Sequence, residues 1–160
     1  MDANMRTVRV YGFLFNSFNQ VLIAVERFNG VAMVKFPGGG VKWGEGHSEA
    51  LIREFKEELN LAIRVEGNIY FNDFAVESVI DSRIQVHSFF YIVKNIEKMN
   101  FSTDPTIQIP HEDGERFVWY NIDDLEEGIL TFKIEQQAFK ALKKSLKNNS
   151  LLKLSTRANP

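Results

Sequence analysis

The sequence GGVKWGEGHSEALIREFKEELNL, from Gly39 to Leu61, joins a glycine-rich turn to a short amphipathic segment. Its carboxylates at Glu54, Glu57 and Glu58 are three and four residues apart, a spacing that places them on one side of a helix. The apolar residues of the segment fall on the adjoining arc, which predicts that this arc is buried. The carboxylates therefore lie at the rim of the core, where unpaired negative charge is costly.

The clustered carboxylates allow two interpretations. A hard divalent cation such as Mg²⁺ or Mn²⁺ would offset the charge, because such ions take oxygen ligands and often bring bound phosphate with them. Alternatively, the carboxylates form a solvated acidic face, in which Arg53 pairs with Glu49 or Glu57 along the helix. The helix alone does not decide between the two.

The wider spacing favours the cation. Gly39 is followed after five residues by Glu45, and after seven more by Arg53 and Glu54. This arrangement resembles the conserved box of the Nudix family, G-x5-E-x7-R-E-U-x-E-E-x-G-U, in which U is a bulky apolar residue. Every charged position of the box matches, and a chance match of this length is improbable.

The sequence departs from the box at two positions. Phe55 is aromatic where the family usually has an aliphatic residue, and Asn60 replaces a glycine. Asn tolerates the left-handed conformation that often follows a helix end, so the second departure casts little doubt on metal binding. Pro37 and Gly38 before the box, and the strands that flank it, also look like the family.

Length and composition favour a single small enzyme domain. A chain of 160 residues can build one core and is too short for two, so we expect a Nudix domain over 1–147 and a flexible tail over 148–160. The net charge of −2 gives no strong nucleic-acid or membrane signal. The absence of cysteine excludes disulfides, a thiol nucleophile and a cysteine zinc site.

No apolar signal segment opens the sequence, and no apolar run approaches the length that spans a bilayer. A cytoplasmic location is therefore the default expectation.

Hydrophobic patterning predicts an alternation of strands and helices. Strands are expected at 6–15, 21–26, 31–36, 62–74, 83–94 and 117–120, helices at 48–59 and 132–146, and a helical turn at 122–126. The turn at 16–19 predicts that the first two strands form a hairpin, and the polar stretch 95–115 reads as a long functional loop. The expected fold is α/β, an α/β/α sandwich around a mixed β-sheet, as the Nudix resemblance also implies.

The resemblance implies a reaction in which water attacks phosphorus and breaks a pyrophosphate bond in a nucleoside diphosphate linked to another moiety. It also implies that Glu54, Glu57 and Glu58 bind Mg²⁺ or Mn²⁺ together with the backbone carbonyl of Gly38. Arg53 matches the arginine that orients the glutamates.

The general base is open between Glu54 in the box and the acidic residues Glu112, Asp113 and Glu115 of the long loop. Of the loop residues we favour Glu115, as a base or a further metal ligand. The alternative is that these loop residues form a solvated turn.

Other residues are candidates for substrate contact. Gly39 and Gly40 allow the backbone to approach metal and phosphate closely, since they lack a Cβ. Arg27, Lys35 and Lys42 could contact a phosphate, or else remain ordinary cations. We expect Glu45 to brace the junction between loop and helix and Trp43 to cover the loop.

The substrate is open among NTPs or dNTPs, nucleotide sugars and similar compounds. A non-catalytic nucleotide-sensing module is the alternative class, although the complete charged box argues against it. A third interpretation, compatible with activity, is that the phenylalanine-rich strands form the interface of a homodimer, which a sizing column would test.

Overall fold

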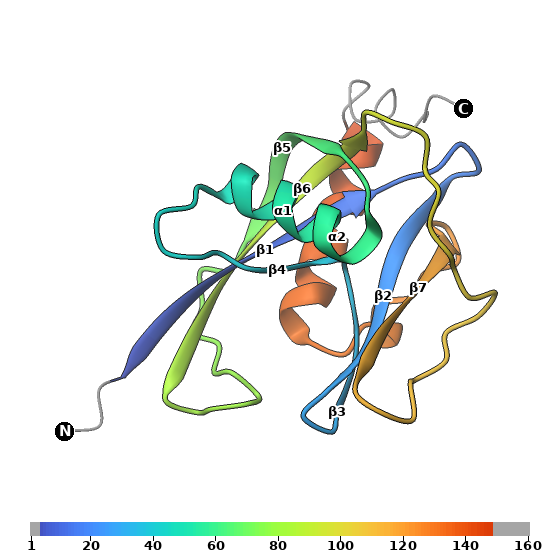
Figure 1. The fold of residues 1–160 in the computed structure, drawn as a ribbon. Helices are drawn as coiled ribbons and strands as arrows, with labels where there is room; N and C mark the ends of the chain where they lie inside the picture. Colours follow the sequence, from blue (N-terminus) through green and yellow to red (C-terminus); the bar gives the residue numbers. More distant parts are fainter. Residues whose placement is uncertain (1–3, 149–160) are drawn as a thin grey trace.

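Figure 1 shows the fold in a computed structural model of the chain, which describes residues 4–148. Within this range the strands are β1 (Met5–Leu14), β2 (Gln20–Phe28), β3 (Val31–Lys35), β4 (Gly38–Gly40), β5 (Ile63–Phe71), β6 (Ile84–Asn95) and β7 (Gly114–Asn121). The helices are α1 (His47–Leu59), the short 3₁₀ helix η1 (Glu127–Ile129) and α2 (Lys133–Asn148).

The strands form two sheets. The first has the order β4-β1-β6-β5, in which β1 runs parallel to β6 and antiparallel to β4. The second has the order β3-β2-β7 and is antiparallel throughout. The α/β expectation with mixed strand directions is thus confirmed, with the sheet divided in two.

Alternating side chains of β1 supply two separate cores. Tyr11 and Phe13 belong to the cluster that includes the buried residues of α2, whereas Val10 and Leu14 belong to the cluster that includes those of α1. Successive side chains of a strand point to opposite faces of its sheet, so the two helices cover opposite faces (Figure 1). This arrangement is the expected sandwich.

The predicted hairpin between the first two strands is wrong. The side chain of Asn16 accepts hydrogen bonds from the backbone N–H groups of Phe18 and Gln20, so the predicted turn is present. Beyond the turn, β1 and β2 share only the bridge between Phe15 and Val21 and then enter different sheets. The second half of β1 is buried on both faces, and the strand lies inside the first sheet with β4 and β6 as its neighbours.

Helix α1 begins and ends close to the predicted positions. The Glu49 carboxylate accepts a hydrogen bond of 2.8 Å from the N–H of Gly46, the residue before the helix. At the other end Asn60 has a φ of 49°, the left-handed conformation expected of it. Asn60 therefore serves where the family box has glycine.

Two other expectations need correction. Glu115 lies on β7 and not in the loop that precedes it, because Gly114 already pairs with Arg27 of β2. The strand predicted to reach residue 74 ends at Phe71. The helical turn expected at 122–126 is present as a single turn over 122–124, closed by a hydrogen bond from the N–H of Leu125 to the carbonyl of Asn121, and η1 follows at Glu127–Ile129.

The C-terminal helix is longer than its apolar pattern, because α2 reaches Asn148. The predicted tail therefore starts inside the helix, and its remainder, 149–160, lies outside the described residues. No helix within residues 4–148 is long and apolar enough to cross a membrane.

Candidate active site

The guanidinium of Arg53 on α1 joins the glycine strand to the acidic side of the helix. It donates to both Glu45 oxygens at 2.5 and 3.0 Å and to the backbone carbonyl of Gly40 at 2.9 Å. It also donates to Glu54 at 2.7 Å and to Glu57 at 3.2 Å. Charge-assisted bonds of this kind fix orientation as well as supply energy, so Arg53 sets the positions of the carboxylates around it.

Glu45 lies at the junction between the loop and the helix. Besides the two bonds from Arg53, its carboxylate accepts a hydrogen bond of 2.9 Å from the backbone N–H of Lys42. The Arg53 bond, helped by that of Lys42, lowers the pKa of Glu45 to about 2. Glu45 therefore stays ionised and bound to the loop, the position that a bracing residue requires.

Gly38 and Gly39 leave no room for a Cβ unless a neighbouring group moves. Gly38 has a φ of 149°, and a Cβ there would overlap the carbonyl oxygen of Val10. A Cβ on Gly39 would lie 2.5 Å from Cδ of Glu54. The glycines thus let β4 lie directly against both β1 and a carboxylate of α1.

A buried group of charges lies beside Glu54. Burial, and next the proximity of Glu115, raises the pKa of Glu58 to about 9. Burial likewise raises the pKa of Glu115, whose buried Oε1 accepts no hydrogen bond. The Lys35 ammonium is 3.1 Å from a Glu26 oxygen and 3.7 Å from Glu115 Oε1. Carboxylates from α1, β2 and β7 therefore share one small region.

The structure does not bring Glu57 into this group. Its side chain is 53% exposed and contacts Arg53 and, at 3.9 Å, the ammonium of Lys42. Among residues 4–148, no group of three or more histidine, aspartate or glutamate side chains is arranged as a finished metal site. The structure thus gathers Glu54, Glu58 and Glu115 and leaves Glu57 at the rim.

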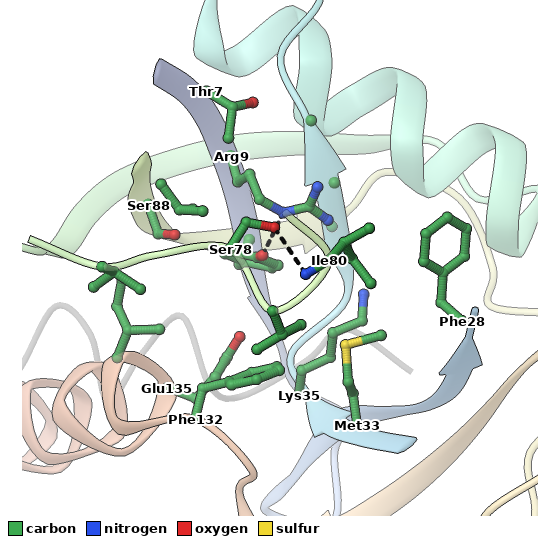
Figure 2. A pocket seen from close by; sticks show the side chains of 18 of the residues that line it. Thr7, Arg9, Phe28, Met33, Lys35, Ser78, Ile80, Ser88, Phe132 and Glu135 are labelled. Atoms are coloured by element: carbon green, nitrogen blue, oxygen red, sulfur yellow. Dashed lines mark hydrogen bonds between the residues drawn. The ribbon is translucent and has the colours of Figure 1, made fainter. Parts of the chain in front are cut away.

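Two of these carboxylates, Glu54 and Glu58, line a cavity of about 520 Å³. Figure 2 shows part of its lining, including Arg9 and Lys35. Its polar lining includes Glu54, Glu58, Lys35 and Arg9, together with the backbone of Gly38–Gly40. Much of the remaining wall is apolar and comes from β2, β3, the segment after β5 and the start of α2, as Phe28, Met33, Phe74, Val76, Ile80 and Phe132. The cavity can therefore take a ligand that has both an anionic and an apolar part.

Other predicted contact residues lie elsewhere. Arg27 does not line the cavity, because its guanidinium donates to the backbone carbonyls of Pro110 and Gly30. Lys42 is also outside the lining, with a side chain that is 64% exposed. Trp43 is fully exposed and does not cover the loop as expected.

The cavity residues that were not singled out from the sequence include Arg9, Glu26 and Glu135. Glu135 is 1% exposed, accepts a hydrogen bond from the N–H of Phe36, and has its pKa raised to about 8 by burial. A signal was present, because Glu135 lies four residues before Phe139 in the apolar stripe of its helix. Arg9 likewise interrupts an apolar strand.

Solved structures share this fold. The solution structure of the E. coli ORF135 protein aligns with a TM-score of 0.70 and 17% identity over 94% of this chain and 97% of that chain. A MutT protein from Methanosarcina mazei aligns with a TM-score of 0.62 and 14% identity over 92% of this chain and 98% of that chain. An ADP-ribose pyrophosphatase from Streptococcus suis aligns with a TM-score of 0.57 and 15% identity over 90% of this chain and 92% of that chain. Identities this low show a common fold alone.

The fold is therefore the one that these solved structures share. The sequence model described as the NUDIX domain matches residues 5–144, and no curated protein matches the chain. The chain therefore belongs to the NUDIX family, and the expectation of a pyrophosphohydrolase is confirmed at the level of that family.

Proposed function

We propose that the chain is a divalent-metal-dependent hydrolase that breaks a pyrophosphate bond in a nucleoside diphosphate linked to another moiety. One observation carries the proposal. The half-buried Glu115 carboxylate lies beside Glu58, a residue that lines a cavity of about 520 Å³, and its buried Oε1 accepts no hydrogen bond.

The residues present fit a hard cation. After burial itself, the proximity of Glu115 raises the pKa of Glu58, and that of Glu26 raises the pKa of Glu115. Carboxylates crowded in this way are poorly compensated, and a divalent cation is the ordinary compensation for oxygen ligands of this kind. Glu54, Glu58 and Glu115, with the carbonyl of Gly38, would hold Mg²⁺ or Mn²⁺. Such an ion, when bound, neutralises phosphate oxygens and makes bound water more acidic.

The other box residues prepare the ligands. Arg53 holds one oxygen of Glu54 at 2.7 Å, and Glu45 holds Arg53 in turn. Glu57 accepts a longer bond of 3.2 Å from Arg53, and its side chain is 53% exposed on the outer side of the helix. We therefore place Glu57 at the rim and Glu54 inside the site.

The general base is best sought among buried groups. Glu115 has an oxygen without a hydrogen bond, whereas Glu54 is held by Arg53, and this difference supports Glu115 as base or ligand. Asp113 has another role, since its oxygens accept hydrogen bonds from the backbone N–H groups of Asn29 and Gly30. Glu112 is exposed.

The cavity supports a nucleotide derivative as substrate. Arg9 and Lys35 supply positive charge near the carboxylates, and the apolar wall suits a base or another flat group. Structures that share the fold include a UDP-X diphosphatase and an ADP-ribose pyrophosphatase. NTPs, dNTPs, nucleotide sugars and ADP-ribose therefore all belong in the assay.

The test is release of nucleoside monophosphate from that panel with Mg²⁺ or Mn²⁺, in the wild type and in Glu58→Gln. Glu66→Gln, at an exposed position of β5, is the matched control. We expect turnover of one substrate class that Glu58→Gln abolishes and Glu66→Gln retains. Nucleotide binding without turnover of any substrate would instead favour a sensing module.

A further inference from the structure

Lys35 brings a buried positive charge into the carboxylate group. Glu26 of β2 and Glu115 of β7 are directly opposite each other in the sheet, a pairing of like charges that destabilises antiparallel strands. Lys35, on the other neighbour of β2, is only 4% exposed, and its ammonium contacts both carboxylates at 3.1 and 3.7 Å. The strand register therefore places an ammonium where the two acids need a cation.

The Lys35 ammonium has two anionic partners in this position, Glu26 and Glu115. The ammonium also lies 5.9 Å from the centre of the Tyr11 ring, within the range of a cation–π contact. Lys35 thus differs from an exposed lysine that waits for a phosphate, because it already has anionic partners inside the protein.

We propose that Lys35 is a resident counter-ion that competes with the divalent cation for Glu115. The inference rests on the metal site proposed above. A divalent cation bound by Glu115 would lie close to the ammonium, and like charges repel strongly where water is excluded. Metal binding therefore requires Lys35 to withdraw from Glu115, and the chain binds its cation more weakly than the same carboxylates would without Lys35.

A purely structural ion pair makes a different prediction. If Lys35 only stabilised the sheet, its removal would lower the stability of the protein and leave the affinity for a cation unchanged or weaker. Competition predicts a tighter cation site in a less stable metal-free protein. The affinity for Mn²⁺ therefore separates the two roles without any measurement of turnover.

The experiment is a titration of the full chain with Mn²⁺, with free Mn²⁺ followed by electron paramagnetic resonance. The wild type is compared with Lys35→Met, which keeps the apolar length of the side chain and removes its charge. Lys98→Met makes the same change of net charge at an exposed loop position. We expect Lys35→Met to bind Mn²⁺ about tenfold more tightly than the wild type, and Lys98→Met to bind like the wild type.

A second variant guards against loss of folding in Lys35→Met. The double variant Lys35→Met with Glu26→Gln removes the ammonium and its nearest acid together, which lowers the charge left unpaired and keeps Glu115 free. It should also bind Mn²⁺ more tightly. Variants that fold only when Mn²⁺ is present would support the proposal, because the metal then takes the place of the ammonium.

Unchanged or weaker Mn²⁺ binding in the variants that fold would overturn the proposal and leave the metal site standing. Variants that stay unfolded in saturating Mn²⁺ would overturn it as well. No Mn²⁺ binding by the wild type or by any variant would contradict the metal site itself, and the inference with it.

Discussion

The carboxylate of Glu54 occupies the space that a side chain on Gly39 would need. A Cβ built on Gly39 lies 2.5 Å from Glu54 Cδ and 2.6 and 2.7 Å from its two oxygens. The carboxylate therefore lies directly against the glycine strand, and Arg53 donates a hydrogen bond of 2.7 Å to it. A side chain at position 39 could be accommodated only if the Glu54 carboxylate moved.

Gly39→Ala should consequently displace Glu54 and weaken the cation site. We expect Mn²⁺ affinity and kcat to fall by about tenfold or more, as for other groups that position a metal ligand. Gly40→Ala is the matched comparison for metal binding, because a Cβ there meets only Arg9, at 3.9 Å. Equal Mn²⁺ affinity in the two variants would show that Glu54 can move without consequence.

Arg53→Lys should impair the site although the charge is kept. Lysine is a point charge and cannot reproduce the bonds that Arg53 makes to Glu45, Glu54 and the Gly40 carbonyl at once. We expect a fall of about ten- to a hundredfold in kcat, with KM changed much less. Steady-state kinetics measures this, and an Arg53→Lys enzyme with wild-type kcat would mean that the guanidinium geometry is unimportant.

Glu115 and Glu112 are three positions apart in the sequence and should behave oppositely. Glu115 is half-buried against Glu58 and Lys35, whereas Glu112 is exposed. Glu115→Gln should lower metal-dependent turnover by at least about a hundredfold if it is a base or ligand. Glu112→Gln should turn over substrate like the wild type. The opposite ranking would indicate that Glu112, in the loop before β7, is the general base.

Glu135 should make the stability of the protein depend on pH. Burial raises its folded-state pKa from 4.5 to about 8. The contribution of the neutral carboxyl to the free energy of unfolding is therefore fully present below pH 4.5 and is lost as the pH rises through 8. Glu135→Gln mimics the neutral carboxyl and should lack this loss. Urea unfolding of both proteins in EDTA should show the variant gaining a few kcal/mol relative to the wild type between pH 5 and pH 9. A constant difference across this range would mean that Glu135 ionises normally.

The sequence predicted what local chemistry determines. The start of α1 at Gly46, its end at Asn60 and the acidic side between them depend on residues of that segment alone, and all three match the expectation. The third strand and the amphipathic helix after residue 132 were also expected. These features need no knowledge of the rest of the chain.

Features that depend on strand pairing were not predictable in the same way. Apolar alternation shows that β1 and β2 are strands, but it does not say that they separate into different sheets. Lys35, Glu26 and Glu115 meet because β3 and β7 flank β2 in a particular register. Sequence separation does not show which residues of different strands come into contact. The sequence therefore identified Lys35 and Glu115 as candidates but not Glu26, and it did not show that the three lie together.

The position of β1 in the first sheet has a kinetic consequence. Met5 pairs with Ile84 and Leu14 with Val93, so the central parallel contact of the domain joins segments that are far apart in the chain. Closing so long a loop is entropically unfavourable and slows the folding of proteins rich in distant contacts. During synthesis, β1 must wait for most of the chain before it finds this partner. Glu115 arrives later still, on β7, so the carboxylates assemble only when nearly the whole domain has left the ribosome.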